Sequence, residues 1–329
     1  MDSTVLKERR KCIVNKITDE LLKIVSDFTG EFKGAFNIRE NGECAGRQSS
    51  KNIQIESKKD APGLIIKIAE NTKDETVYIP ACVTHGNFDD LVYNDFYVGK
   101  NADVTIVAGC GVHTDTEEDA RHNGIHKFIL EENAKVLYQE KHIGTGKGTG
   151  AKKIDPVTEC ELKKGSSLTM DTIQIGGVDK TTRKTTASLG EDAKLIIRER
   201  IMTDGDETAD TDFTVSLNGK NSAADVVSRS VAKGNSKQSY ISNIIGNNIS
   251  KGHTECDAIL VDNGTVTASP RLTANNCDSE LIHEAAIGKI AGEQLLKLRT
   301  LGLTEEEAEQ KIIQGFIGCL LYTSPSPRD

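Results

Sequence analysis

The residues best suited to chemistry stand near the end of the chain, where LIHEAAIGKIAGEQLLKL (281–298) places His283 directly before Glu284. At a helix start, Glu284 would interact with the positive end of the helix dipole and His283 would be a surface residue. Imidazole and carboxylate are also metal ligands. Cys256, in the strand-like segment GHTECDAILVD, would add a thiolate, although a lone cysteine in a strand is usually a core residue. Spacing alone leaves both interpretations open.

A second group of metal-ligand types lies in CGVHTDTEEDARHNGIHKF (110–128). Thiolate and imidazole at this density can bind a transition metal, whereas a polar loop between strands would contain histidines without any metal. Both interpretations remain open. Cys277, which precedes the His-Glu pair, is either a further ligand or a thiol that fills a coil. The candidate ligands of the second group are Cys110, His113, His122 and His126.

Hydrophobic periodicity predicts the elements that position these residues. From Thr4 to Phe28, apolar residues recur at three- and four-residue steps, which indicates an amphipathic helix that Gly30 ends. The polar stretch up to residue 57 is expected to be mostly loop with short strands. Turn-forming phrases and alternating segments then repeat for about 200 residues, as in EENAKVLYQEKH (131–142). A parallel β-helix explains this repetition best, because each coil buries its inward residues against its neighbours.

A β-helix also stacks residues that are distant in sequence, so a cysteine on one coil and a His-Glu pair on a later one can meet. Thiolate, imidazole and carboxylate together form a mixed site that suits iron. Such a site would release a cluster more readily than four thiolates would.

The end of the chain is expected to be a helical hairpin. Its first helix would run from Ser279 or Leu281 to Leu301, and Thr304 with Glu307 would form a capping box at the start of the second. Two Ser-Pro steps among the last residues cannot continue a helix, so we expect a non-native tail there. The predicted organisation is an N-terminal helical and loop segment (1–57), a β-helix core (58–278), a C-terminal helical segment (279–318) and the tail (319–329).

Charge and composition exclude several classes of protein. The 50 acidic and 41 basic residues give a net charge of −9, so the positive field that nucleic-acid binding needs is missing. No apolar run is long enough to cross a membrane and no secretory signal begins the chain, which predicts a cytoplasmic protein without a membrane span. The eight cysteines form no CxxC pair and are expected to be free thiols.

The segment 252–316 combines a Cys-Asp pair that opens a strand, the HEA step, and then IGKIAGEQL and GLTEEEA before a closing GF. These motifs closely resemble the C-terminal core of the SufB/SufD family of iron–sulfur cluster assembly scaffolds. The resemblance extends back to GAFNIRENG (34–42). It implies a right-handed parallel β-helix flanked by helices. Retention of HEA with the cysteine makes the chain more B-like than D-like, and its shortness suggests a single-type scaffold.

The resemblance also implies roles and partners. Cys256 would accept sulfur and bind the nascent cluster, and Glu284 with His283 would complete its ligands. An ABC-type ATPase of the SufC kind would dock on the C-terminal helices, and two scaffold chains would pair as a homodimer or a SufB/SufD-type pair. Sulfur would come from a cysteine desulfurase or its shuttle protein. The iron–sulfur cluster is then a transient cargo passed to apo iron–sulfur proteins, and the chain is not an enzyme.

Two alternative functions would require different residues. A cluster-free structural partner of the same ATPase would need none of the proposed ligands. A carbohydrate-active β-helix enzyme would favour paired carboxylates and aromatic platforms, which the absence of Trp and an aromatic content of 4% oppose.

Overall fold

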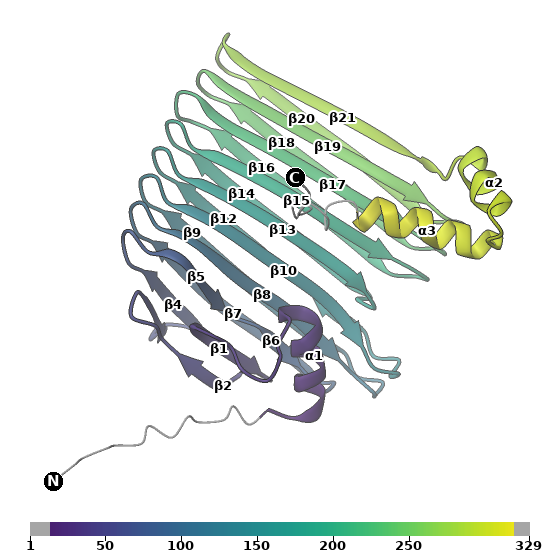
Figure 1. The fold of residues 1–329 in the computed structure, drawn as a ribbon, viewed down its shortest axis with the longest axis horizontal. Coiled ribbons are helices and arrows are strands. Elements are labelled where there is room, and N and C mark those ends of the chain that lie inside the picture. Colours follow the sequence, from purple (N-terminus) through teal and green to yellow (C-terminus); the bar gives the residue numbers. More distant parts are fainter. Residues whose placement is uncertain (1–13, 319–329) are drawn as a thin grey trace, which may run out of the picture.

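Strands dominate the computed structural model, which describes residues 14–318 (Figure 1). They stack into a parallel β-solenoid of about 8 turns, with one helix at its N-terminal end and two helices at its C-terminal end. The predicted fold class, a parallel β-helix with helices at both ends, is confirmed. No helix within the described range has the length and apolar character that crossing a bilayer requires.

Two sheets face each other across the core, and most coils contribute a strand to each. Pairing is parallel throughout except at the antiparallel pairs β1–β2 and β3–β4. Sheet A has 11 strands: β1 (Ala35–Glu40), β2 (Glu43–Gln48), β5 (Lys73–Tyr78), β6 (Ala81–Val83), β8 (Asp103–His113), β10 (Lys135–Thr145), β13 (Ser167–Gly176), β15 (Lys194–Thr203), β17 (Ser222–Ala232), β19 (Ser250–Leu260) and β21 (Ser279–Lys289). Sheet B has 10 strands: β3 (Ile53–Ser57), β4 (Gly63–Ile68), β7 (Phe88–Val98), β9 (Ala120–Leu130), β11 (Lys152–Ile154), β12 (Val157–Leu162), β14 (Lys180–Leu189), β16 (Thr208–Leu217), β18 (Lys237–Gly246) and β20 (Thr265–Ala274).

Side chains alternate between the core and the outer surface along most of these strands, except where a helix also covers the outer face, as over β8. In β9 every second residue is buried, from Ala120 to Leu130. The core between the sheets consists mainly of branched aliphatic residues, and the rings of Phe96 and Phe128 stack within it with centroids 4.6 Å apart. Because neighbouring strands pair in register, a residue type that suits one coil lies beside its counterpart on the next.

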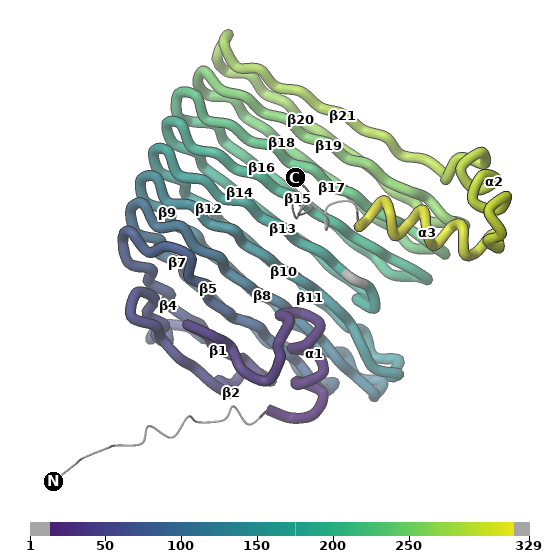
Figure 2. The backbone as a smooth tube through the Cα atoms, viewed as in Figure 1, coloured from purple at the N-terminus to yellow at the C-terminus, as the bar shows by residue number. Residues whose placement is uncertain are grey.

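The turns that join the two sheets stack on one another as the coils do (Figure 2). Asn101 and Asn133 adopt left-handed backbone conformations, with φ of 56° and 58°, which asparagine tolerates better than most residues. Nδ2 of Asn101 donates to Oδ1 of Asn71 at 3.2 Å, and Nδ2 of Asn133 donates to Oδ1 of Asn101 at 3.3 Å. The repeated turn phrases therefore set the chain reversal and also bond one coil to the next.

Helix α1 (Lys16–Ser26) covers the outer face of sheet A at the N-terminal end. The Asn15 side chain caps it by accepting from the backbone N–H of Thr18 at 2.8 Å. The predicted helix from Thr4 to Phe28 is thus confirmed in its second half. Its first part, up to residue 13, lies outside the described residues.

Two glycines of β8 allow α1 to approach the sheet closely. A Cβ on Gly109 would lie 2.3 Å from the carbonyl oxygen of Val25, and one on Gly111 would lie 2.9 Å from the Leu21 side chain. Larger residues at these positions would push the helix away from β8.

The C-terminal segment differs from the prediction in its first half. The prediction that a helix begins at Ser279 or Leu281 is wrong. Residues 279–289 form strand β21, and helix α2 (Gly292–Thr300) begins only after it. β21 pairs with β19 along its whole length. This pairing satisfies backbone groups of both strands, which outweighs a local helix preference. The segment 30–57 likewise contains three strands and is less loop-like than expected.

Helix α3 (Glu305–Gly318) begins with the predicted capping box. The backbone N–H of Thr304 donates to the Glu307 carboxylate at 2.8 Å, and that of Glu307 donates to Oγ1 of Thr304 at 3.1 Å. Ile313 packs with Val231 and Val261, so α3 covers the outer face of sheet A near the C-terminal end (Figure 1). The predicted tail 319–329 lies outside the described residues.

We predict that Gly109→Ala lowers the free energy of unfolding by about 1–3 kcal/mol, because the new methyl group cannot coexist with the Val25 carbonyl. Urea unfolding measures this change. Gly288→Ala on the outer face of β21 is the matched control, since its Cβ would meet no atom within 4 Å. Equal losses in the two variants would contradict the assigned contact between α1 and β8.

Candidate functional site

Cys256 lies in the middle of β19 and points into the solenoid, where the residue is 1% exposed. Its register neighbours on the adjacent strands are Ser228 and Ala285. Burial, with the nearby charges of Glu199 and Asp257, raises the pKa of the Cys256 thiol to about 12. The isolated chain therefore holds this group as a thiol at neutral pH, and a base or a metal ion must act before it becomes a thiolate.

His283 and Glu284 lie within β21 and not at a helix start, so the helix-dipole interpretation does not apply. Consecutive strand residues point to opposite faces. His283 pairs with Thr254 on the inner face that also carries Cys256, whereas Glu284 pairs with Glu255 on the outer face. Nδ1 of His283 is buried and has no hydrogen-bond partner among residues 14–318. The structure thus brings His283 toward Cys256 and separates Glu284 from both.

Glu284 instead meets His253 and Glu255 on the outer face of sheet A. One ligand-type atom of each of the three residues lies within 4.8 Å of the other two. His253 Nδ1 donates to Oδ1 of Asp225 at 2.8 Å. Sequence reasoning missed His253 and Glu255, although their spacing of two residues in a strand places both on one face.

Cys277 joins neither group. It is exposed in the turn between β20 and β21. Register pairs Ser279 with Ser250, so Cys256 lies further along the strands by six residues, or about 20 Å. The interpretation of Cys277 as an extra ligand gains no support from this placement.

The second predicted group is also divided, and its members lie in β8 and β9 and not in a loop. Cys110, His122 and His126 are buried and point into the solenoid. His113 points outward, and its Nδ1 lies 2.9 Å from Oγ1 of Thr145. Three of the four predicted residues therefore share the interior, and the fourth does not.

Cys110 has two further ligand-type neighbours, Glu140 and His142 of β10, each with one ligand-type atom within 4.8 Å of the others. Burial and the Glu140 charge raise the pKa of the Cys110 thiol well above its usual value. Burial would also raise the pKa of Glu140, but His142 and Arg183 outweigh it and hold that pKa well below the usual range. Nη1 of Arg183 donates to the Glu140 carboxylate at 2.8 Å. Sequence reasoning missed Glu140 and His142, although they occupy alternate positions of YQEKHI.

His126 is bound on both sides of its ring. Oη of Tyr138 donates to Oε1 of Glu140 at 2.8 Å, so it accepts from Nδ1 of His126, which lies 2.8 Å away. Nε2 of His126 then accepts from Nδ2 of Asn94 at 3.3 Å. Only a neutral imidazole has one donor and one acceptor, and burial lowers the His126 pKa to about 4.

The interior polar groups continue as far as Cys256. Nε of Arg183 lies 3.2 Å from Oε1 of Glu199, and Oε2 of Glu199 accepts from Oγ of Ser228 at 2.9 Å. Ser228 is the register neighbour of Cys256. We call the line His126–Tyr138–Glu140–Arg183–Glu199–Ser228–Cys256 the interior polar path.

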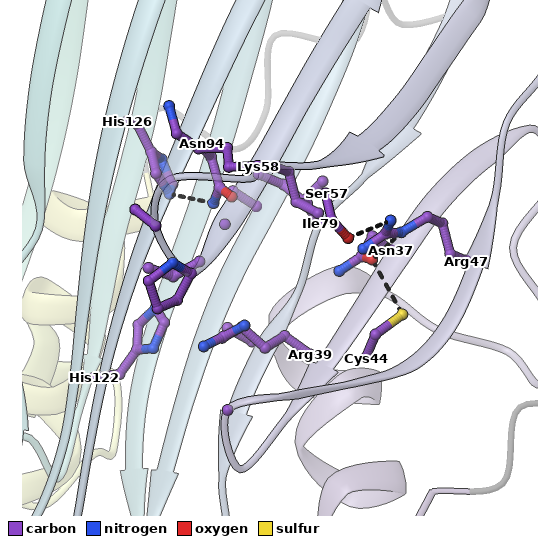
Figure 3. Close-up of a pocket in the computed structure, with 18 of the residues that line it drawn as sticks. Asn37, Arg39, Cys44, Arg47, Ser57, Lys58, Ile79, Asn94, His122 and His126 are labelled. Carbon is purple, nitrogen blue, oxygen red and sulfur yellow. Dashed lines mark hydrogen bonds between the residues drawn. The ribbon is translucent and has the colours of Figure 1, made fainter.

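A pocket of about 250 Å³ adjoins the start of this path (Figure 3). Cys110, His122 and His126 line it from the solenoid, and Arg47 and Lys58 line it from the N-terminal strands and their loops. Because Lys58 is paired with Asp95, the lining is polar without a large excess of positive charge, and it suits a small polar species.

The hydrogen bonds drawn in Figure 3 order the outer wall of this pocket. Oδ1 of Asn37 accepts from Nε of Arg47 at 2.8 Å and from the Cys44 thiol at 3.3 Å. Arg47 also donates through Nη1 to Oγ of Ser57 at 2.9 Å. A second thiol is thereby held beside the arginine at the pocket wall.

Fold and site together define a β-solenoid protein with buried thiols along an interior polar path. A family model described as SUF system FeS cluster assembly, SufBD core domain, matches residues 93–316. The chain belongs to this SufBD family, and membership implies a role in iron–sulfur cluster assembly. The resemblance drawn from the sequence motifs is confirmed at the level of the family.

Similar proteins named iron–sulfur cluster assembly SufBD family proteins occur in several archaea. The one from Archaeoglobus fulgidus is 29% identical over 261 residues, which cover 78% of this chain and 69% of the relative. One from Methanothermobacter thermautotrophicus is 29% identical over 251 residues, 74% of this chain but only 59% of the relative. One from Methanocaldococcus jannaschii is 28% identical over 321 residues, 92% of this chain and 99% of the relative.

We expect His126 to make stability sensitive to acid. Its pKa in the folded chain is about 4, against 6.5 ordinarily, so between these values the unfolded chain binds more protons. The free energy of unfolding should therefore fall as pH drops through this window, by up to about 3 kcal/mol from His126 alone.

Urea unfolding across this pH range tests the assignment. His126→Gln is expected to reduce the pH dependence, because a side chain that does not titrate replaces the buried imidazole. The control is His113→Gln at the outward-facing histidine of β8. The same reduction in both variants would show that the interior position of His126 is not the cause.

Proposed function

We propose that this protein is a scaffold on which an iron–sulfur cluster is assembled and from which it is transferred, in partnership with a SufC-like ABC ATPase. The observation that carries the proposal is that Cys256 of β19 and His283 of the adjacent strand β21 lie on the same inner face. A thiol and an imidazole without a hydrogen-bond partner at Nδ1 provide two ligands for iron. The chain itself would turn over no small substrate and would not be an enzyme.

Sulfur would arrive as a persulfide on a cysteine desulfurase or its shuttle protein. The Cys256 thiolate would attack the outer sulfur of that persulfide, so a new S–S bond forms at Cys256 and the donor cysteine leaves as a thiolate. No net oxidation occurs in this exchange. Because burial opposes the thiolate, the reaction needs proton removal, for which His283 on the same inner face is a candidate base.

Glu284 would reach the same cluster only after a rearrangement of β21. A shift of one residue in the register of a strand exchanges its inner and outer faces, which would turn Glu284 inward. β21 is the last strand of sheet A and pairs only with β19 among the described strands, so it is the strand most easily moved. ATP hydrolysis by the partner would supply the energy for this movement.

Two surfaces support the proposed assembly. The edge strands β20 and β21 leave backbone groups unpaired within residues 14–318, and Leu272 and Ile282 on them are exposed, which suits pairing with a second scaffold chain. Leu296 in α2 and Leu301 at its end are 62% and 75% exposed and would contact the ATPase.

The described cysteines are all free thiols, as expected for a cytoplasmic location.

A cluster-free structural partner of the ATPase is the second candidate. The placement of Glu284 and Cys256 on opposite faces favours it, because the predicted ligands do not converge in this conformation. Both candidates bind the ATPase, but only the scaffold binds iron and sulfide.

The deciding experiment is anaerobic reconstitution with iron and sulfide, with and without the ATPase, followed by absorption and Mössbauer spectroscopy. We expect a cluster in the wild type and none in Cys256→Ala. Glu284→Ala should lose the cluster formed in the presence of the ATPase. Cys160→Ala, which removes another buried, inward-facing thiol, is the control and should retain the cluster.

A cluster that survives both substitutions would move assembly to Cys110 and its neighbours. The absence of any cluster in the wild type would establish the structural-partner function instead.

A further inference from the structure

The outer face of sheet A carries side chains that the interior polar path does not use. Register aligns Glu255 of β19 with Glu284 of β21, and His253 lies on the same face two residues before Glu255. The side chains of His253 and Glu255 are 32% and 21% exposed, and Glu284 is exposed. An ion can therefore reach this face directly from solvent.

Asp225 determines which ring nitrogen of His253 is free. A carboxylate only accepts hydrogen bonds, so the 2.8 Å contact with Oδ1 of Asp225 places the proton on Nδ1. Nε2 keeps its lone pair, which is the form of histidine that binds a metal. Arg198 holds Asp225 in turn, donating to Oδ2 at 2.6 Å. A carboxylate behind the ring is the arrangement that orients histidine ligands in metal sites.

The negative charge on this face is only weakly compensated. Glu255 has one distant counter-charge, Nη2 of Arg229 at 3.9 Å. Glu284 forms no ion pair with any residue of the described range 14–318. A divalent cation between the two glutamates would balance their negative charge.

We propose that His253, Glu255 and Glu284 bind one divalent first-row transition-metal ion on the outer face of sheet A. One imidazole and two carboxylates suit such an ion, and they leave coordination positions for water, so the ion would stay exchangeable. The ion is ferrous iron if the proposed scaffold function holds, and that identification rests on it. The binding site itself is independent of Cys256, which faces the other side of the sheet.

An anaerobic titration of the full chain with Co²⁺, read from the visible absorption of the bound ion and repeated with Fe²⁺ as competitor, tests the site. His253→Ala and Glu284→Gln should each weaken binding at least about tenfold, because each removes a ligand. Asp225→Asn should weaken it about 10- to 100-fold without touching the ion. Arg229→Gln should strengthen it severalfold, because a cation that competes for Glu255 is removed.

Glu280→Gln and His113→Gln are the matched controls, because Glu280 is an exposed carboxylate of β21 that pairs with Lys251 and His113 is an outward-facing histidine of β8. Their Co²⁺ affinities should equal that of the wild type. Unchanged affinity in His253→Ala and Glu284→Gln, or an equal loss of binding in Glu280→Gln, would overturn the proposal. Urea unfolding of each variant identifies any loss of Co²⁺ binding that is caused by misfolding. Misfolding is not expected in Glu284→Gln, because the two side chains have nearly the same shape and β21 is an edge strand.

Cluster reconstitution in the same variants separates this inference from the proposed function. If the wild type forms no cluster but binds Co²⁺, and His253→Ala loses that binding, the metal site is supported and the scaffold function is contradicted. The opposite result is also possible: the wild type forms a cluster, and His253→Ala binds Co²⁺ as tightly as the wild type does. That result would contradict the metal site and support the scaffold.

Discussion

Parallel, in-register pairing of the coils governs where side chains lie throughout this solenoid. β17 with β19, and β19 with β21, each pair along the whole strand. Every such ladder satisfies backbone donors and acceptors of both strands, and a slip by one residue would exchange all inner and outer side chains. Register therefore decides whether a thiol or carboxylate belongs to the interior or to the surface.

The interior combines an apolar core with the polar path, and each depends on the other. Arg183 of β14 lies between Glu140 of β10 and Glu199 of β15, at 2.8 and 3.2 Å. Buried charges are tolerated only when they are paired, and removal of one partner leaves the others uncompensated. These pairs cross from one sheet to the other and from coil to coil, so the same contacts that permit polar groups inside also join the stack together.

The two faces of sheet A have different chemistry at the C-terminal end. Cys256 and His283 lie inside, next to the end of the polar path, whereas His253, Glu255 and Glu284 lie outside. Helix α3 borders the outer group, because the guanidinium of Arg229, which lies near Glu255, sits 5.9 Å from the Phe316 ring centroid. Helix α3 is thus connected by one side chain to the acidic outer face of the last coils.

The class of fold, the capping box at Thr304 and the family could all be predicted from the amino-acid sequence. Turn phrases, strand alternation and helix caps are local, so a few neighbouring residues are enough to specify them. The local pattern also predicted a helix at 279–289, which is wrong. This segment is a strand because it pairs with β19, which lies elsewhere in the sequence.

Which side chains meet could be read only from the folded chain. It separated Glu284 from Cys256, joined it to His253, and brought Glu140 and Arg183 to the interior thiol Cys110. The physical reason is that alternation along a strand shows that two faces exist, whereas the stacking of distant coils decides which face turns inward and which residues become neighbours.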